Sequence, residues 1–310
     1  MKIYITYTKD SFTKEEIQKL KQNGEIVFLE NTFDLDKAPY LDDDSEKILM
    51  VDPDWYHWDI NEKHLSKIKN LKAVCLATTA FDWIDLDYCG KNNILVTNIP
   101  KYSTDSVAEY ALFLMMSLAK RFPIQMKKDY KMEYSKSMLT TEIRNKTVGI
   151  IGLGTIGTKV AEMCKSLGMN VLYWNRSDRN IDYKRVDIDT IFETADFIIP
   201  AFSTNEETKK IITDDRIYKM NGNALINVIN NPEELYNHQL LIKLAEEEKI
   251  SYAFEIYDDG KKMYDYKGNI MATAPYAFYT KDAIDRLLKI WCANAISIVE
   301  GNNQNIVKKN

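Results

Sequence analysis

The chain has 310 residues, of which 45% are hydrophobic and 28% charged, and its formal net charge is −5 at pH 7. These values are ordinary for a globular protein, and the length favours two domains over a single core. No basic stripe indicates a nucleic-acid partner, and no apolar run reaches the roughly 18 residues that a membrane span requires.

The four cysteines are widely separated and form no Cys-x-x-Cys pair. This spacing fits reduced thiols better than a disulfide framework or a zinc site. We therefore expect a cytoplasmic protein without a metal site, which binds neither nucleic acid nor a membrane.

Strand-like and helix-like segments alternate from the first residues, which is the pattern of parallel α/β proteins. The strands expected in the first hundred residues are Lys2–Tyr7, Glu25–Glu30, Lys47–Val51, Ala73–Thr78 and Ile94–Asn98. The helices expected there are Lys14–Gln22 and Asn61–Ile68.

The segment Val107–Ala119 is nearly all apolar, which is too much for a helix with one buried stripe. We expect a helix buried on several sides, either between domains or at a subunit interface. The second interpretation predicts a homodimer formed through the region 104–120.

A second α/β run extends from Lys146 to about Ala277, and the helix-like segment Lys281–Glu300 follows the last strand. That helix could return to the first domain. The polar tail GNNQNIVKKN is expected to fray.

The most specific signal is the stretch Gly152-Leu153-Gly154-Thr155-Ile156-Gly157. It follows the apolar strand Val148–Ile151 and opens the helix Ile156–Leu167, and a further strand follows at Asn170–Trp174. In this context the three glycines permit a tight turn, close approach of a pyrophosphate and helix–strand packing. The residues expected to bind a dinucleotide are Gly152, Gly154, Thr155, Ile156 and Gly157. The alternative is a glycine-rich turn without a ligand.

The end of the strand Asn170–Trp174 bears on which dinucleotide is bound. An NAD site places an acidic residue there to bind the ribose hydroxyls, whereas this chain has Asn175-Arg176-Ser177. A neutral Asn175 does not repel a 2′-phosphate, Arg176 can pair with it, and Ser177 supplies a further donor. We therefore expect NADP(H) as the cofactor. The alternative is that Arg176 is a solvated surface residue.

Over nearly its whole length the chain resembles the D-2-hydroxyacid dehydrogenase family. The resemblance is carried by the stretches LKAVCLATTAFDWID, NIPKYSTDSVAEYALF, ADFIIPAFSTNEETKKII, NALINVINNPEEL, SYAFEIYDDG and NIMATAPYAFYTKDAI. It implies two doubly wound parallel-sheet α/β domains, with a Rossmann cofactor domain inserted into a flavodoxin-like substrate domain. The implied boundaries are 1–100 with 281–310 for the substrate domain and 101–280 for the NADP-binding domain.

The family's catalytic set is an Arg that grips the substrate carboxylate, a His that acts as acid or base, and a Glu that raises the His pKa. In this chain Asn230 stands where the Arg belongs and Tyr276 where the His belongs. Asp258 or Asp259 could be a displaced form of the Glu. Glu255 occupies the position of an Asp that hydrogen-bonds the nicotinamide amide.

Two interpretations of Tyr276 follow. It is either a proton donor beside the hydride acceptor or an aromatic side chain that fills the space left by the histidine. The loop VDPDWYHWDI offers Trp55 and Tyr56 as substrate-pocket residues and His57 as another candidate acid, although such a run is also typical of packing. Thr79 and Ala80 lie in the family's substrate-binding turn, whose backbone N–H groups need no particular side chain. His64 and His238 are expected at the surface.

Two functions follow from this pattern. The first is an NADP(H)-dependent reductase of a small substrate other than an ordinary 2-oxo acid, such as an imine or a carbonyl without an adjacent carboxylate. The alternative is a catalytically inactive NADP(H)-binding pseudoenzyme with a regulatory or scaffolding role.

Overall fold

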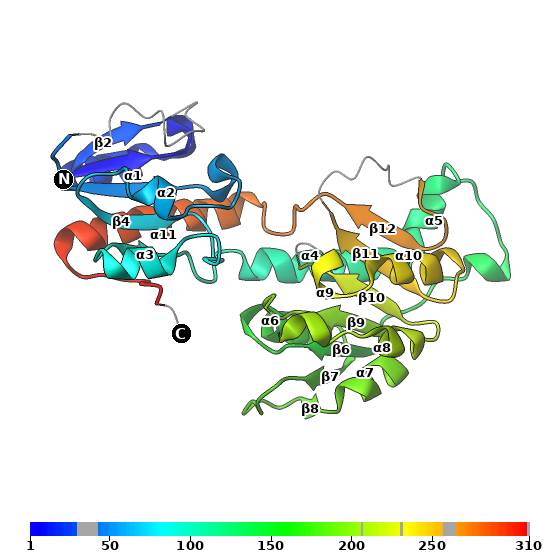
Figure 1. Ribbon diagram of the computed structural model, residues 1–310. Helices are drawn as coiled ribbons and strands as arrows, with labels where there is room; N and C mark the ends of the chain where they lie inside the picture. The colour runs from blue at the N-terminus through cyan, green and yellow to red at the C-terminus, as the bar shows by residue number, and fades with distance from the viewer. Residues whose placement is uncertain (30–42, 206, 230–231, 257–264, 309–310) are drawn as a thin grey trace. The chain divides into compact units, whose positions relative to one another are not determined.

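The computed structural model describes residues 1–29, 43–205, 207–229, 232–256 and 265–308 (Figure 1). The chain divides into two compact units, the first formed by Met1–Tyr102 with Lys281–Asn310 and the second by Ser103–Thr280. Each unit contains one sheet of parallel strands, which confirms the expected α/β class. Within the described residues, no helix combines the length and the apolar character needed to cross a membrane.

The sheet of the first unit has the strand order β2-β1-β3-β4-β5. Its strands are β1 (Lys2–Ile5), β2 (Glu25–Phe28), β3 (Lys47–Val51), β4 (Leu71–Leu76) and β5 (Leu95–Thr97). Its α-helices are α1 (Lys14–Asn23), α2 (Glu62–Leu65), α3 (Leu86–Lys91) and α11 (Lys281–Glu300), with short 3-10 helices at η1 (Lys9–Ser11) and η3 (Pro53–Tyr56). This strand order is the flavodoxin-like one.

The last helix, α11, completes the core of the first unit. Trp291 is fully buried, stacks against Phe12 and donates a 2.7 Å hydrogen bond from Nε1 to the backbone oxygen of Cys75 in β4. An indole is buried at low cost only when its N–H finds an acceptor, and the strand carbonyl provides one. The first unit is therefore built from both ends of the chain.

The expectation that the C-terminal tail frays is wrong for its described part. The backbone N–H of Val307 donates to the oxygen of Val96 in β5 at 2.8 Å, and Asn98 N–H donates to Asn305 O at 3.2 Å. The amide of Asn305 also donates to Oδ1 of Asn294 in α11 at 2.8 Å. These bonds tie the tail to the edge strand of the sheet.

The sheet of the second unit has the order β12-β11-β10-β9-β6-β7-β8. Its strands are β6 (Thr147–Ile151), β7 (Asn170–Trp174), β8 (Lys184–Arg185), β9 (Phe197–Pro200), β10 (Ala224–Asn227), β11 (Ser251–Glu255) and β12 (Ile270–Thr273). Its α-helices are α4 (Thr104–Ala119), α5 (Phe122–Lys127), α6 (Thr155–Ser166), α7 (Ile188–Thr194), α8 (Asp214–Tyr218), α9 (Pro232–Leu235) and α10 (His238–Glu246), with 3-10 helices at η4 (Lys136–Met138) and η5 (Thr208–Lys210).

The strand order reverses at β6, which pairs with β7 on one side and β9 on the other. In doubly wound sheets ligands bind at the carboxyl ends of the strands at such a switch point. The fold therefore predicts a ligand-binding site formed by the loops after β6, β7 and β9.

The apolar helix α4 packs one side into the core of the second unit, where Ala108, Ala111, Leu114 and Met115 are fully buried. Another side of α4 is open within this chain, because Phe113 is 46% and Met116 is 38% exposed.

The expected surface position of His238 is wrong. Its side chain is 3% exposed, hydrogen-bonds the hydroxyl of Tyr252 at 2.8 Å through Nδ1, and packs edge-on against Phe254. A neighbouring phenol satisfies the imidazole, so the histidine is part of the core. His64 is half-buried, and its Nδ1 accepts a 3.2 Å hydrogen bond from the backbone N–H of Asn61.

Candidate functional site

The glycine turn lies between β6 and α6. Gly152 has φ 96°, and a Cβ at this position would lie 2.8 Å from the backbone oxygen of Ala201. A Cβ at Gly157 would lie 2.1 Å from the oxygen of Gly152, whereas a Cβ at Gly154 would meet nothing within 4 Å. The packing of the turn thus requires glycine at 152 and 157. Gly154 faces open space, where a pyrophosphate could approach the protein backbone closely.

The first turn of α6 presents uncapped N–H groups beside this space. Gly154 is the N-cap and makes no side-chain capping bond, and Thr155 and Ile156 open the helix. An uncapped helix N-terminus directs its N–H groups and the positive end of its dipole outward, which favours phosphate oxygens. The turn therefore fits the pyrophosphate of a dinucleotide.

Asn175 follows β7 and links the two loops at the switch point. Its Oδ1 accepts a 3.1 Å hydrogen bond from the backbone N–H of Leu153, and its Nδ2 donates to the oxygen of Ser177 at 2.9 Å. A carboxylate could make only the first of these bonds, because it has no donor. The amide therefore shapes the loop after β7 without adding negative charge.

Arg176 and Ser177 are exposed beyond Asn175. The guanidinium of Arg176, with 82% of its side chain exposed, forms an ion pair with Glu207 from the loop after β9. Arg185 in β8 donates from Nη2 to the backbone oxygen of Asn175 at 2.9 Å, so a second guanidinium fixes the start of this loop.

Glu255 lies at the carboxyl end of β11 and is 2% exposed. Its Oε1 accepts a 2.7 Å hydrogen bond from the backbone N–H of Ala277. Burial raises the pKa of Glu255 to about 7, while the backbone N–H groups of Ala277 and Tyr276 act in the opposite direction. The carboxyl group therefore changes charge near neutral pH while holding the loop after β12.

The loop after β12 is fixed at Ala277 and open at Tyr276. Ala277 is buried, and its backbone oxygen accepts a hydrogen bond from the hydroxyl of Ser106 in α4. The Tyr276 side chain is 59% exposed, and its ring centroid lies 6.2 Å from that of Tyr279. The backbone of the loop is thus held from β11 and α4, and the phenol of Tyr276 points outward.

In the first unit the turn after β4 carries Thr79 and Ala80, which are both exposed. The Thr79 hydroxyl donates to the oxygen of Ile99 at 2.7 Å, and the amide of Asn98 donates to the oxygen of Thr79 at 2.7 Å. Within the described chain, the backbone N–H groups of Thr79 and Ala80 have no acceptor. The turn is therefore held by these two bonds, and its two backbone donors without an acceptor would suit an oxyanion or a carbonyl.

The aromatic run after β3 is partly core. Tyr56 is 8% exposed and packs in an apolar cluster of the first unit, with Trp55 packed against that cluster. His57 is exposed in a left-handed conformation with φ 48° and ends the 3-10 helix. Of the three residues, His57 is the one that the structure leaves open to solvent.

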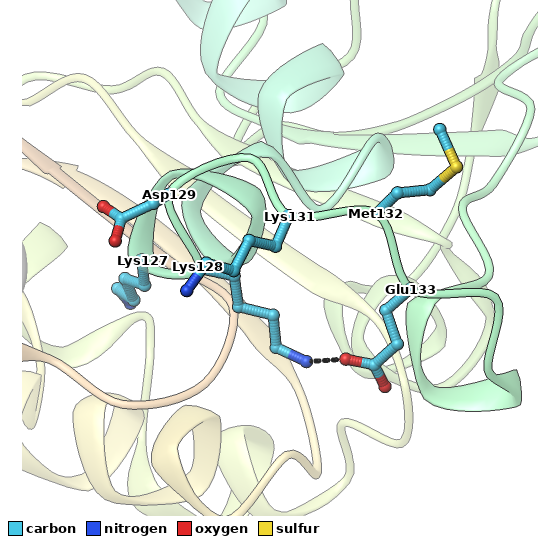
Figure 2. A pocket seen from close by; sticks show the side chains of 6 residues that line it. All are labelled: Lys127, Lys128, Asp129, Lys131, Met132 and Glu133. Atoms are coloured by element: carbon cyan, nitrogen blue, oxygen red, sulfur yellow. Dashed lines mark hydrogen bonds and ion pairs between the residues drawn. The ribbon is translucent and has the colours of Figure 1, made fainter.

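A shallow hollow lies at the end of α5 and contains none of these residues (Figure 2). Lys127 donates to the backbone oxygen of Gly268 at 3.1 Å, and Lys128 pairs with Glu133. Two of the three lysines that line the hollow are therefore already engaged.

Asn230 and the pair Asp258 and Asp259 lie outside the described residues. Within the described ranges, no cluster of three or more His, Cys, Asp or Glu side chains is arranged to hold a metal ion.

Three contacts at the site involve residues that the sequence analysis did not single out: Ser106 at Ala277, Arg185 at Asn175 and Glu207 at Arg176. The partners are separated by 171, 10 and 31 positions. The contact of Glu207 with Arg176 follows from the sheet order, which places the loops after β7 and β9 on either side of the loop after β6.

The strand order and the glycine turn define a dinucleotide-binding domain of the Rossmann type. A family model described as the NAD-binding domain of D-isomer-specific 2-hydroxyacid dehydrogenases matches residues 112–258. The chain belongs to the D-2-hydroxyacid dehydrogenase family, which confirms the resemblance seen in the sequence.

Two relatives illustrate the match. A Staphylococcus aureus protein assigned to the 2-hydroxyacid dehydrogenases is 32% identical over 77% of this chain and 79% of its own length. One from Staphylococcus haemolyticus is 27% identical over 98% of this chain and 99% of its own.

Two solved structures match at 25% identity. An acyclic imino acid reductase in complex with NADPH and D-Arg superposes with a TM-score of 0.82 over 99% of this chain and 100% of its own. The D-lactate dehydrogenase of Aquifex aeolicus, complexed with NAD and lactic acid, has a TM-score of 0.80 and covers 100% of both chains. The matched structures thus include both cofactor types.

Proposed function

We propose that this protein is an NADP(H)-dependent reductase that acts on a C=N or C=O bond of a small substrate other than an ordinary 2-oxo acid. The observation that carries the proposal is Asn175, whose amide bonds both Leu153 and Ser177 where an NAD site has an acid. The exposed guanidinium of Arg176 follows directly and offers a cation for a 2′-phosphate.

The residues of the second unit fit this cofactor. Gly152, Gly154 and Gly157 shape the turn, and the N–H groups at Thr155 and Ile156 would hold the pyrophosphate. When bound, the nicotinamide supplies a hydride to the carbon being reduced. Glu255 lies at the carboxyl end of β11, where the family places the residue that bonds the nicotinamide amide.

The substrate class follows from what the chain lacks. Asn230 has neither the charge nor the planar fork with which an arginine binds a carboxylate. The N–H groups of Thr79 and Ala80 remain suited to a carbonyl or an imine with a polar neighbour. The similarity to an imino acid reductase bound to NADPH and D-Arg supports C=N reduction, and it also makes imino acids a necessary part of any substrate panel.

Tyr276 is the proposed proton donor. A phenol can donate a proton to the nitrogen or oxygen that gains negative charge as the carbon accepts the hydride. The loop that carries Tyr276 is anchored at Ala277 by Glu255 and Ser106, so the backbone is positioned while the ring stays accessible.

We also propose that the protein is a homodimer through the region 104–120. Phe113 and Met116 expose apolar surface on α4, and four large apolar side chains downstream are more exposed still: Tyr130, Met132, Tyr134 and Leu139. Covering such a surface with a second copy removes it from water.

The test is NADPH oxidation against a matched panel of imines without a carboxylate, imino acids formed from 2-oxo acids and amines, simple ketones and free 2-oxo acids. Turnover of imines or ketones with weak activity on free 2-oxo acids supports the proposal. NADPH binding without turnover on any member supports the pseudoenzyme alternative. Turnover confined to 2-oxo acids contradicts the proposed substrate class.

A further inference from the structure

The guanidinium that the proposed function assigns to the cofactor phosphate already has an anionic partner. Arg176 pairs with the carboxylate of Glu207, and the two side chains are 82% and 71% exposed. Both are therefore accessible to a ligand. The pair joins the loop after β7 to the loop after β9, on either side of the glycine turn that follows β6.

The loop that carries Glu207 is held by its own hydrogen bonds. Oδ1 of Asn205 accepts from the backbone N–H of Glu207 and of Thr208, each at 3.0 Å. The hydroxyl of Thr208 donates to the oxygen of Ser203 at 2.8 Å. The backbone N–H of Glu207 is therefore held by Asn205 independently of the ion pair with Arg176.

The loop after β7, which carries Arg176, is also held by hydrogen bonds of its own. Arg185 and the Asn175 amide bond the backbone around Arg176. Asp178, the other nearby acid, accepts from the hydroxyl of Tyr173 at 3.2 Å and from the backbone N–H of Arg179 at 2.9 Å. Glu207 is thus the carboxylate that the described chain places on the Arg176 guanidinium.

We infer that Glu207 is a specificity-determining residue that competes with the 2′-phosphate of NADP(H) for Arg176. Its carboxylate neutralises the cation that the phosphate needs, and it repels the phosphate if both remain near the guanidinium. NADH has no 2′-phosphate, so the competition lowers affinity for NADP(H) selectively. The inference rests on the proposed function, because it takes Arg176 as the phosphate-binding residue.

The experiment measures the dissociation constants of NADPH and NADH for the wild type, Glu207→Gln, Arg176→Ala and the double variant. Because the pair is exposed, we expect Glu207→Gln to tighten NADPH binding by about two- to fivefold and to leave NADH unchanged. In the Arg176→Ala background the same substitution is expected to have no such effect. Glu142→Gln is the matched control, since it removes an exposed glutamate before the amino end of β6.

The outcomes distinguish an error in the role of Glu207 from an error in the proposed phosphate site at Arg176. If Arg176→Ala removes the preference for NADPH but Glu207→Gln leaves NADPH affinity unchanged, Glu207 is not a competitor. Equal tightening of NADH and NADPH would show a general charge effect and would also overturn the inference. If Arg176→Ala leaves the cofactor preference unchanged, the proposed phosphate site itself is wrong.

Discussion

The carboxylate of Glu255 and the backbone N–H of Ala277 are joined by a 2.7 Å hydrogen bond. This bond fixes the loop after β12 at one residue while its neighbour, Tyr276, stays exposed. A buried acid therefore controls the backbone that carries the proposed proton donor.

The buried acid predicts a pH dependence of stability. The pKa of Glu255 is raised from 4.5 to about 7 by burial, so between these values the unfolded chain has lost a proton that the folded chain keeps. The free energy of unfolding therefore falls as pH rises through this window, by about 3 kcal/mol for this group. Glu255→Gln keeps a carbonyl acceptor for Ala277 and removes the titration, so it should gain stability relative to the wild type as pH rises.

Urea unfolding at pH ~5 and ~8 measures this effect. Glu142→Gln, which changes an exposed side chain, should show the same small difference at both values. If the free energy of unfolding of Glu255→Gln also differed from that of the wild type by the same amount at both pH values, the raised pKa of Glu255 would be wrong.

Tyr276→Phe is expected to lower turnover by about 100- to 10,000-fold while leaving NADPH affinity unchanged, because it removes the proton donor and keeps the ring. Tyr279→Phe is the matched control, since Tyr279 is equally exposed and lies beside Tyr276. Wild-type turnover in Tyr276→Phe would assign Tyr276 to packing and make His57 the next candidate.

NADPH is expected to bind more tightly than NADH, and Asn175→Asp should reverse the order. The carboxylate can still accept from Leu153, but it repels a 2′-phosphate and can bind the ribose hydroxyls of NADH. We expect at least a tenfold loss of NADPH affinity, equal to about 1.4 kcal/mol. Titration of both cofactors by tryptophan fluorescence measures this, and an unchanged ratio would contradict the assignment.

Pyruvate, glyoxylate and hydroxypyruvate are expected to be poor substrates, with turnover below about 1 per second, because Asn230 replaces the carboxylate-binding arginine. Asn230→Arg should raise kcat/KM for pyruvate more than for a ketone without a carboxylate. Ordinary dehydrogenase rates on pyruvate in the wild type would show that another cation binds the carboxylate.

Sedimentation at micromolar concentration is expected to show a dimer, and Phe113→Asp should shift it toward monomer by placing a charge in the apolar contact. Tyr218→Asp, which changes a still more exposed aromatic on α8, should leave the dimer intact. A monomeric wild type would remove the proposed interface.

The sequence predicted the parts of the fold that depend on local pattern. The apolar run of β3 lies between Lys47 and Asp52, and β3 and β7 have the bounds expected for them. The glycine turn was recognisable because strand, turn and helix are contiguous. These signals do not depend on distant partners.

Long-range pairing explains what the sequence analysis missed. The burial of His238 depends on Tyr252, fourteen positions away, and the order of the tail depends on Val96 in an edge strand. The Arg176–Glu207 pair joins two loops that become neighbours only when β9 is inserted beside β6. Charge alone did not distinguish Glu207 from the other acids of the chain.

The placement of α11 has a consequence for biosynthesis. All seven strands of the second unit precede Lys281, so that sheet can be completed while α11 is still inside the ribosome. The first unit must wait, because Trp291 fills its core and bonds Cys75 only after α11 emerges. The nascent first unit therefore leaves the apolar surface that Trp291 covers exposed for the time taken to translate the second.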